Sequence, residues 1–172
     1  AGKLKVIKSH YENLEARKAE LEELILALAT PYQQELAILQ TAPGISSDFT
    51  AIGIISEIGT NMEAFPSAKH LCSWAGLTPT NNESAGKKKS VRVSKAGCYI
   101  KPLLVQCANA VVKSSKHPEM RNRYLRLKKR RGHKKAIIAI ARMLLTALYH
   151  MLKNGENYNA ELYQKSDLLP VD

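Results

Sequence analysis

The sequence predicts a mainly α-helical fold: a compact helical domain with a helix-hairpin-helix-like element, preceded by an N-terminal coiled-coil helix. Apolar residues recur at helical spacing along most of the 172 residues, and Gly and Pro separate the helical stretches. With 45% hydrophobic residues, the chain can bury one substantial core and add an extended appendage. We therefore predict a coiled-coil or linker helix at residues 3–30, a domain at 31–158 and a tail at 159–172.

The N-terminal helix is predicted from residues 6–29, which contain neither Gly nor Pro. Along this helix, two rows of residues recur every seven positions. This spacing is typical of a coiled-coil seam, which predicts a homo-oligomer joined through this helix. Because the pattern covers only about three heptads, an ordinary amphipathic helix packed on its own core is the alternative. Two rows recur every seven positions, the second with one polar interruption: Leu14, Leu21 and Leu28, and Tyr11, Lys18 and Ile25.

A short helix containing Leu36 and Leu39, a turn at residues 41–47 and a helix from Phe49 to Ile58 follow. This order resembles a helix-hairpin-helix, in which backbone N–H groups at a helix start hold a DNA phosphate. Two turn residues are therefore candidate nucleic-acid contacts: Gly44 and Ser46. The alternative is a plain helical turn in which Pro43 and Gly44 supply only geometry.

Three more helices are predicted, at about Lys69–Trp74, Ile100–Val112 and Ala136–Leu152. Trp74 lies among apolar neighbours, so we expect it in the core, with stacking on a nucleobase as the alternative. The stretch 78–97 is polar instead, and we allow one small β-hairpin there, with a brief strand at Val91–Val93.

Lys and Arg number 26 against 15 Asp and Glu, which gives a formal net charge of +11. This balance favours a polyanionic partner, with nucleic acid first and an anionic membrane surface second. The membrane interpretation is weaker because no uninterrupted apolar stretch reaches the ~20 residues of a spanning helix, and nothing at the start resembles a signal peptide. We therefore expect a cytoplasmic protein.

The positive charge gathers in two segments. One is the polar loop, and the other runs from Arg121 to Lys135 with an interruption at Gly132. Both are candidate nucleic-acid contacts, and the alternative for the second is an ordinary solvated face. The candidates are Lys87, Lys88, Lys89, Arg92 and Lys95 in the loop, and Arg126, Lys128, Lys129, Arg130, Arg131, Lys134 and Lys135 in the second segment.

Metal-dependent phosphoryl transfer by a cluster of carboxylates is disfavoured within this chain. Between Ser84 and Lys153 the only acidic residue is Glu119, and the five histidines show no paired-ligand spacing. We predict no metal site. The three cysteines have no CxxC spacing and are expected to be buried reduced thiols: Cys72, Cys98 and Cys107.

A hydroxyl that attacks phosphorus needs an exposed side chain, nearby cations and a proton acceptor. Ser84 lies in a loop of small residues just before the three lysines of the polar loop, and Glu83 is a candidate proton acceptor. Serines in such Asn- and Gly-rich loops usually satisfy turns, so composition alone favours a structural role.

A series of short motifs, in order, resembles the C-terminal domain of the IS110/IS116/IS902 transposases and spans about Leu39 to Tyr158. The acidic helix before it resembles the coiled coil that joins the two domains of that family. Any one motif would be weak, whereas their shared order is specific. The main ones are Thr41–Ile45, Glu57–Gly59, Phe65–Lys69, Ala75–Pro79, Ser84, Gly86-Lys87, Val93–Gly97 and Ala139–Arg142.

The resemblance implies DNA strand cleavage and exchange in a bacterial or archaeal cell. It places on Ser84 a serine that becomes transiently linked to DNA, with Ser94 as the second candidate. It also implies a preceding RuvC-like domain whose carboxylates bind Mg²⁺, and an element-encoded RNA as a further partner. We expect this chain alone to be inactive in recombination. The sequence departs from the family pattern at Ala85, Cys98 and Pro102.

Overall fold

The computed structural model describes residues 2–79, 82–84, 87–90 and 93–161. The chain forms two units, Ala1–Gln33 and Gln34–Asp172, which are described separately below. The described residues are mainly helical, as predicted. The predicted tail lies mostly outside the described residues.

The first unit consists of helix α1 (Gly2–Ala29) and the short 3₁₀ helix η1 (Thr30–Tyr32). Ion pairs between side chains one turn apart, such as Lys8–Glu12 and Lys18–Glu22, follow its surface. Its apolar residues are open to solvent, and Leu14, Leu21 and Leu28 are 55%, 59% and 68% exposed. The two heptad rows also extend one heptad further toward the N-terminus than the sequence pattern indicated, to Leu4 and Ile7, which are exposed as well.

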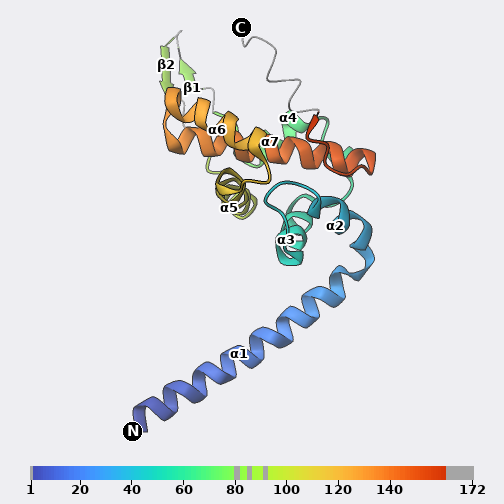
Figure 1. The fold of residues 1–172 in the computed structure, drawn as a ribbon, viewed down its shortest axis with the longest axis vertical. Coiled ribbons are helices and arrows are strands. Elements are labelled where there is room, and N and C mark those ends of the chain that lie inside the picture. Colours follow the sequence, from blue (N-terminus) through green and yellow to red (C-terminus); the bar gives the residue numbers. More distant parts are fainter. Residues whose placement is uncertain (1, 80–81, 85–86, 91–92, 162–172) are drawn as a thin grey trace. The chain divides into compact units, whose positions relative to one another are not determined.

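The second unit is built from six α-helices, one 3₁₀ helix and one hairpin within the described residues (Figure 1). Each helix predicted in this part of the sequence is present, most with longer ends. The elements are α2 (Gln33–Gln40), α3 (Asp48–Ile58), η2 (Met62–Ala64), α4 (Ala68–Trp74), β1 (Asn82–Ser84), β2 (Lys87–Ser90), α5 (Ile100–Lys113), α6 (Pro118–Arg131) and α7 (His133–Asn154).

Helix α7 is the centre of this unit, because α4, α5 and α6 all pack against it (Figure 1). Ile140, Leu144 and Leu148 on α7 are completely buried. Burying an aliphatic side chain of this size contributes about 1.5–3 kcal/mol, so this one helix supplies much of the apolar driving force. By length and composition α7 is also a candidate membrane span, and 56% of that stretch is buried inside the domain.

Two predictions about single side chains are wrong. Trp74 is 45% exposed and its ring lies at a tilt against that of Phe65, so it is a surface residue and not a core residue. Cys98 is exposed, whereas Cys72 and Cys107 are buried as predicted. Burial raises the pKa of the Cys107 thiol to about 11, which keeps it protonated and unreactive at neutral pH.

The predicted β-hairpin is present, although its position differs from the prediction. Its strands are β1 and β2, which precede the expected strand at Val91–Val93. Residues 91 and 92 lie outside the described residues, and Val93 forms an isolated antiparallel bridge with Pro79. The hairpin therefore begins at residues close to the end of α4 and ends close to the start of α5.

The two arms of this hairpin meet at a contact between two backbones, at Gly76 and Gly97. Both glycines have positive φ, +67° and +66°. A methyl group on Gly97 would collide with the carbonyl group of Ala75, and one on Gly76 would collide with the carbonyl oxygen of Ala96. Only glycine permits both this conformation and this approach. We call this contact the glycine junction.

Lys101, in the first turn of α5, closes the glycine junction. Its Nζ donates hydrogen bonds to the carbonyl oxygens of Ser94, at 2.7 Å, and Ala96, at 2.8 Å. Charge-assisted hydrogen bonds of this kind are stronger than neutral ones. The returning arm of the hairpin is thus tied to α5, which is itself packed on α7.

We expect Gly97→Ala to lower the free energy of unfolding by about 2–5 kcal/mol, because it adds both a strained φ and a steric clash. Gly155 is the matched control: its φ is +68°, but a methyl group there meets nothing within 4 Å. Gly155→Ala should therefore cost only about 1–2 kcal/mol, the backbone strain alone. Urea unfolding of both variants gives the comparison, and equal losses would contradict the close packing at the junction.

Candidate nucleic-acid interface

Ser84 is the last residue of β1. In the antiparallel register of the hairpin, the Cα partner of Ser84 is Lys87, and that of Glu83 is Lys88. The two residues between the strands, 85 and 86, lie outside the described residues. The backbone therefore brings the candidate nucleophile and the first of the three lysines to facing positions. Figure 1 shows the hairpin toward the N-terminal end of α7.

The second basic segment spans two packed helices, the end of α6 and the start of α7, which meet at Gly132. Its inner side is anchored by Met120 and Tyr124 on α6 and by Ala136 and Ile137 on α7, all buried. The candidate cations of this segment are all exposed, and we call this surface the basic helix pair: Arg126, Lys128, Lys129, Arg130, Arg131, Lys134 and Lys135.

The helix break at Gly132 concentrates this charge. Gly132 has a φ of +80°, which turns the chain between the last turn of α6 and the first turn of α7. Cations in the last turn of α6 interact favourably with the negative end of that helix. Those in the first turn of α7 do not, since they lie at its positive end. An anion that binds there would relieve this unfavourable arrangement.

Tyr124 and His133 join the two helices, a contact that the sequence pattern did not predict. The Tyr124 hydroxyl and His133 Nδ1 are 2.8 Å apart, and their rings meet edge to face with centroids 5.9 Å apart. Lys128 Nζ lies 5.7 Å from the centre of the Tyr124 ring. When the hydroxyl donates to Nδ1, the neutral imidazole keeps its proton on Nε2. The residues are nine apart with a helix break between them, so no helical spacing connects them.

The turn at residues 41–47 shows why Gly44 is a glycine. Its φ is +78°, and a methyl group on it would lie 2.6 Å from the carbonyl oxygen of Cys107 in α5. Ile45 beside it is buried, and Ser46 is exposed. At the start of α3 the carboxylate of Asp48 accepts a hydrogen bond from the Gln40 side chain. Gly44 thus has a packing role, and Asp48 already supplies negative charge at the helix end where a phosphate would bind.

Ser94, the second candidate nucleophile, belongs to the glycine junction. It is half-buried, and its Oγ accepts a hydrogen bond from the Ala96 backbone N–H at 3.2 Å. Lys95 beside it is exposed. Lys87, Lys88 and Lys89 lie on β2, whereas Arg92 is outside the described residues.

The acidic side chains of the described residues form no candidate metal site. No group of three or more His, Cys, Asp or Glu side chains among these residues is arranged to hold a metal ion. Glu119 lies in the first turn of α6, 3.3 Å from Nδ1 of His117. The Mg²⁺ chemistry implied by the family resemblance therefore finds no ligand set among these residues.

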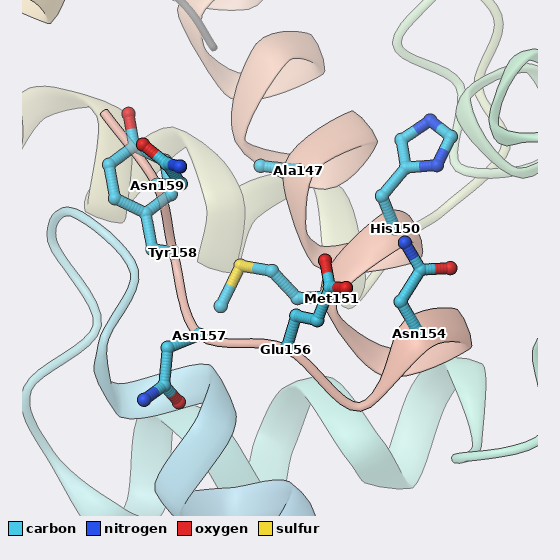
Figure 2. Close-up of a pocket in the computed structure, with 8 residues that line it drawn as sticks. All are labelled: Ala147, His150, Met151, Asn154, Glu156, Asn157, Tyr158 and Asn159. Atoms are coloured by element: carbon cyan, nitrogen blue, oxygen red, sulfur yellow. The ribbon is translucent and has the colours of Figure 1, made fainter. Parts of the chain in front are cut away.

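A pocket of about 550 Å³ lies at the C-terminal end of α7, the opposite end of that helix from the basic helix pair (Figure 2). A helix of 22 residues is about 33 Å long, so the two features are well separated. None of the predicted site residues lines this pocket. It is lined by Ala147, His150, Met151, Asn154, Glu156, Asn157, Tyr158 and Asn159.

Comparison with known proteins gives a consistent result. Residues 36–125 match the model of the transposase IS116/IS110/IS902 family. The chain is 29% identical over 127 residues to an uncharacterized 43.6 kDa protein of insertion element IS110 from Streptomyces coelicolor, which covers 73% of this chain and 30% of that protein. It is also 28% identical over 132 residues to pilin gene-inverting proteins of Moraxella bovis and Moraxella lacunata, which covers 74% of this chain and 40% of each relative.

The chain thus spans less than half the length of these curated relatives. The matched region runs from α2 to the middle of α6 and includes the glycine junction and the hairpin with Ser84. The helical architecture, the ordered motifs and the family match agree with one another. The chain belongs to the IS116/IS110/IS902 family of transposases.

Proposed function

We propose that this chain is the domain of a DNA recombinase that supplies a serine nucleophile, Ser84, for strand cleavage and exchange. The observation that carries the proposal is the hairpin register, in which Ser84 faces Lys87 at the end of β1, in a chain that belongs to a transposase family. Cleavage of a phosphodiester by a hydroxyl needs positive charge close to the attacked phosphate. The hairpin contains both the attacking hydroxyl and the positive charge within one short segment.

In the proposed step, Oγ of Ser84 attacks the scissile phosphorus. The bond from phosphorus to one deoxyribose oxygen breaks, and that oxygen leaves as a hydroxyl after it takes a proton. The serine loses its proton, for which Glu83 is a candidate acceptor, and the phosphodiester is kept as a serine–DNA linkage. A hydroxyl of a second strand reverses the step and releases Ser84, so rejoining needs no external energy source.

The basic helix pair is proposed to hold the nucleic acid through its phosphates. Seven exposed cations, five at the end of α6 and two in the first turn of α7, suit a polyanion better than a small anion. Duplex DNA and an element-encoded RNA share this backbone chemistry. Gly44 and Ser46 remain predicted phosphate contacts, although the packing of Gly44 and the charge of Asp48 favour the simpler turn.

Helix α1 is proposed to join two copies of the chain. Its heptad rows are exposed along their length and run over four heptads when Leu4 and Ile7 are included. Two copies would allow two strands to be cut at the same time, as an exchange or an inversion of DNA requires. The pilin gene-inverting relatives are named for such an inversion.

The second candidate function is a non-catalytic module that binds nucleic acid and dimerises. The part of the domain around the basic helix pair contains few acidic residues, and Glu119 there lies beside His117. This scarcity of carboxylates favours binding over catalysis. In that case Ser84 is an ordinary turn residue. The two functions differ in one measurable product, the covalent linkage to DNA.

We expect Ser84→Ala to abolish a covalent protein–DNA adduct and Ser94→Ala to leave it. The natural protein that contains this chain is incubated with labelled duplex from the end of its element in the presence of Mg²⁺. The reaction is stopped with detergent, and the adduct is separated by denaturing electrophoresis. An adduct that survives Ser84→Ala and disappears in Ser94→Ala would overturn the assignment.

Binding of duplex DNA and of structured RNA should weaken steeply as salt rises, because each neutralised phosphate releases counterions. Replacing Lys128, Arg131 and Lys134 by Gln should reduce the slope of log affinity against log salt by about 2–3. Lys8, Lys18 and Lys153 have ion-pair partners and serve as the matched control triple. Equal slopes in the two triple variants would contradict the role of the basic helix pair.

Leu14→Asn combined with Leu21→Asn should convert an oligomer to a monomer, since both side chains lie on the proposed seam. Glu15→Asn combined with Glu22→Asn, one position along the same helix, is the control and should keep the oligomer. Sedimentation equilibrium measures the mass. A wild-type chain that stays monomeric at high concentration would remove the coiled-coil assignment.

A further inference from the structure

Trp74, which is exposed, and Phe65, which is half-buried, form an aromatic pair that the proposed function has not used. Their ring centroids are 5.7 Å apart with planes inclined by 59°. Trp74 is 45% exposed, so nearly half of this large aromatic side chain is open to solvent. Together the two rings offer an apolar aromatic surface that an external group can contact.

The backbone below this pair is firmly held. Around Trp74, the residues Leu71, Cys72 and Ala75 of the same segment are buried, so α4 presents its opposite face to the core. The carbonyl oxygen of Phe65 accepts a hydrogen bond from the Tyr149 hydroxyl of α7, at 3.2 Å. The indole is therefore exposed because α4 is held to the core by its opposite face, and the ring projects from a firmly packed helix.

Polar groups lie close to Trp74 along the chain. His70 precedes Trp74 by one helical turn on the same side of α4, is exposed, and has its Nδ1 2.9 Å from the Ser67 hydroxyl. The acidic residue of the preceding segment, Glu63, is 3.2 Å from Lys153 Nζ and is thereby compensated. A polyanion therefore meets no uncompensated carboxylate from this segment.

The position along the chain connects the aromatic pair with the hairpin. Gly76, two residues after Trp74, packs against the loop at Ser94–Ala96 in the glycine junction. The exposed Lys95 belongs to that loop. Trp74 thus stands at the base of the hairpin whose first strand ends at Ser84. Strand exchange unpairs the bases beside the break, so unpaired bases are available close to the nucleophile.

We propose that Trp74, with Phe65 at its edge, is a stacking site for an unpaired nucleobase of the nucleic acid that this domain handles. The inference rests on the proposed function. Stacking on an aromatic ring is tolerant of base identity, because every base has a π-face. The site therefore adds affinity for single-stranded segments over perfect duplex, which phosphate contacts alone do not provide.

The chain offers a direct measurement, because Trp74 is its only tryptophan. Intrinsic fluorescence is followed while the full 172-residue chain is titrated with three probes. These are an oligothymidylate, the same strand annealed to its complement, and an abasic strand of equal length and charge. We expect strong quenching by the oligothymidylate and little by the other two, since only the first offers unpaired bases.

Trp74→Leu should weaken oligothymidylate binding by about tenfold and leave binding of the abasic strand unchanged. Tyr32→Leu is the matched control, because Tyr32 is 43% exposed and lies in the other unit. Trp74→Phe should restore most of the affinity, because a smaller aromatic ring still stacks. Anisotropy of a labelled strand measures these affinities without using the tryptophan.

The outcomes separate the two proposals. Salt-dependent binding of all three probes without selective quenching, and with equal affinity in Trp74→Leu, would overturn the stacking site and keep the phosphate-binding function. Equal quenching by the abasic strand would also overturn it, since the indole would then report backbone binding. If no probe binds, the proposed function itself fails, and Trp74 is left as a surface for a protein segment.

Discussion

The packing of α4, α5 and α6 against α7 is the constraint on which the rest of the domain depends. Helix α7 is apolar over most of its length and buries side chains toward all three neighbours. Because α4 and α5 both pack on α7, the segment that connects them leaves α4 and enters α5 at nearby points. The hairpin with Ser84 is the result, and the glycine junction is the point at which its arms meet.

The division of charge follows from the same core. The N-terminal half of α7 buries only a narrow apolar strip, and the C-terminal half of α6 buries no residue, so the remaining positions can hold Lys and Arg. The C-terminal half of α7 is buried more completely and ends at a pocket whose lining includes three asparagines, Asn154, Asn157 and Asn159. The two ends of α7 therefore differ, because the exposed cations of the basic helix pair gather at its N-terminal end.

The surface chemistry of the domain has two complementary parts. Cations of the basic helix pair suit the phosphate backbone, whatever the base sequence. The proposed aromatic pair suits bases that have lost their partners. Ser84 lies on the hairpin between the segments that contain these groups, at residues 65–74 and 121–135. Strand exchange needs both kinds of contact, because a broken strand must be held by its backbone while its bases change partner.

The sequence by itself determined the helical class, nearly every helix, the two basic segments and the family, because apolar spacing, Gly and Pro punctuation and ordered motifs are local signals. Only the tertiary structure decided which way individual side chains face. Trp74 has apolar neighbours along the chain but lies on the outer side of α4. Position 44 must be glycine because the carbonyl oxygen of Cys107, far away in the sequence, lies where a side chain would begin. The Tyr124–His133 contact and the backbone pairing of Ser84 with Lys87 likewise arise where the chain reverses direction, which local apolar spacing does not specify.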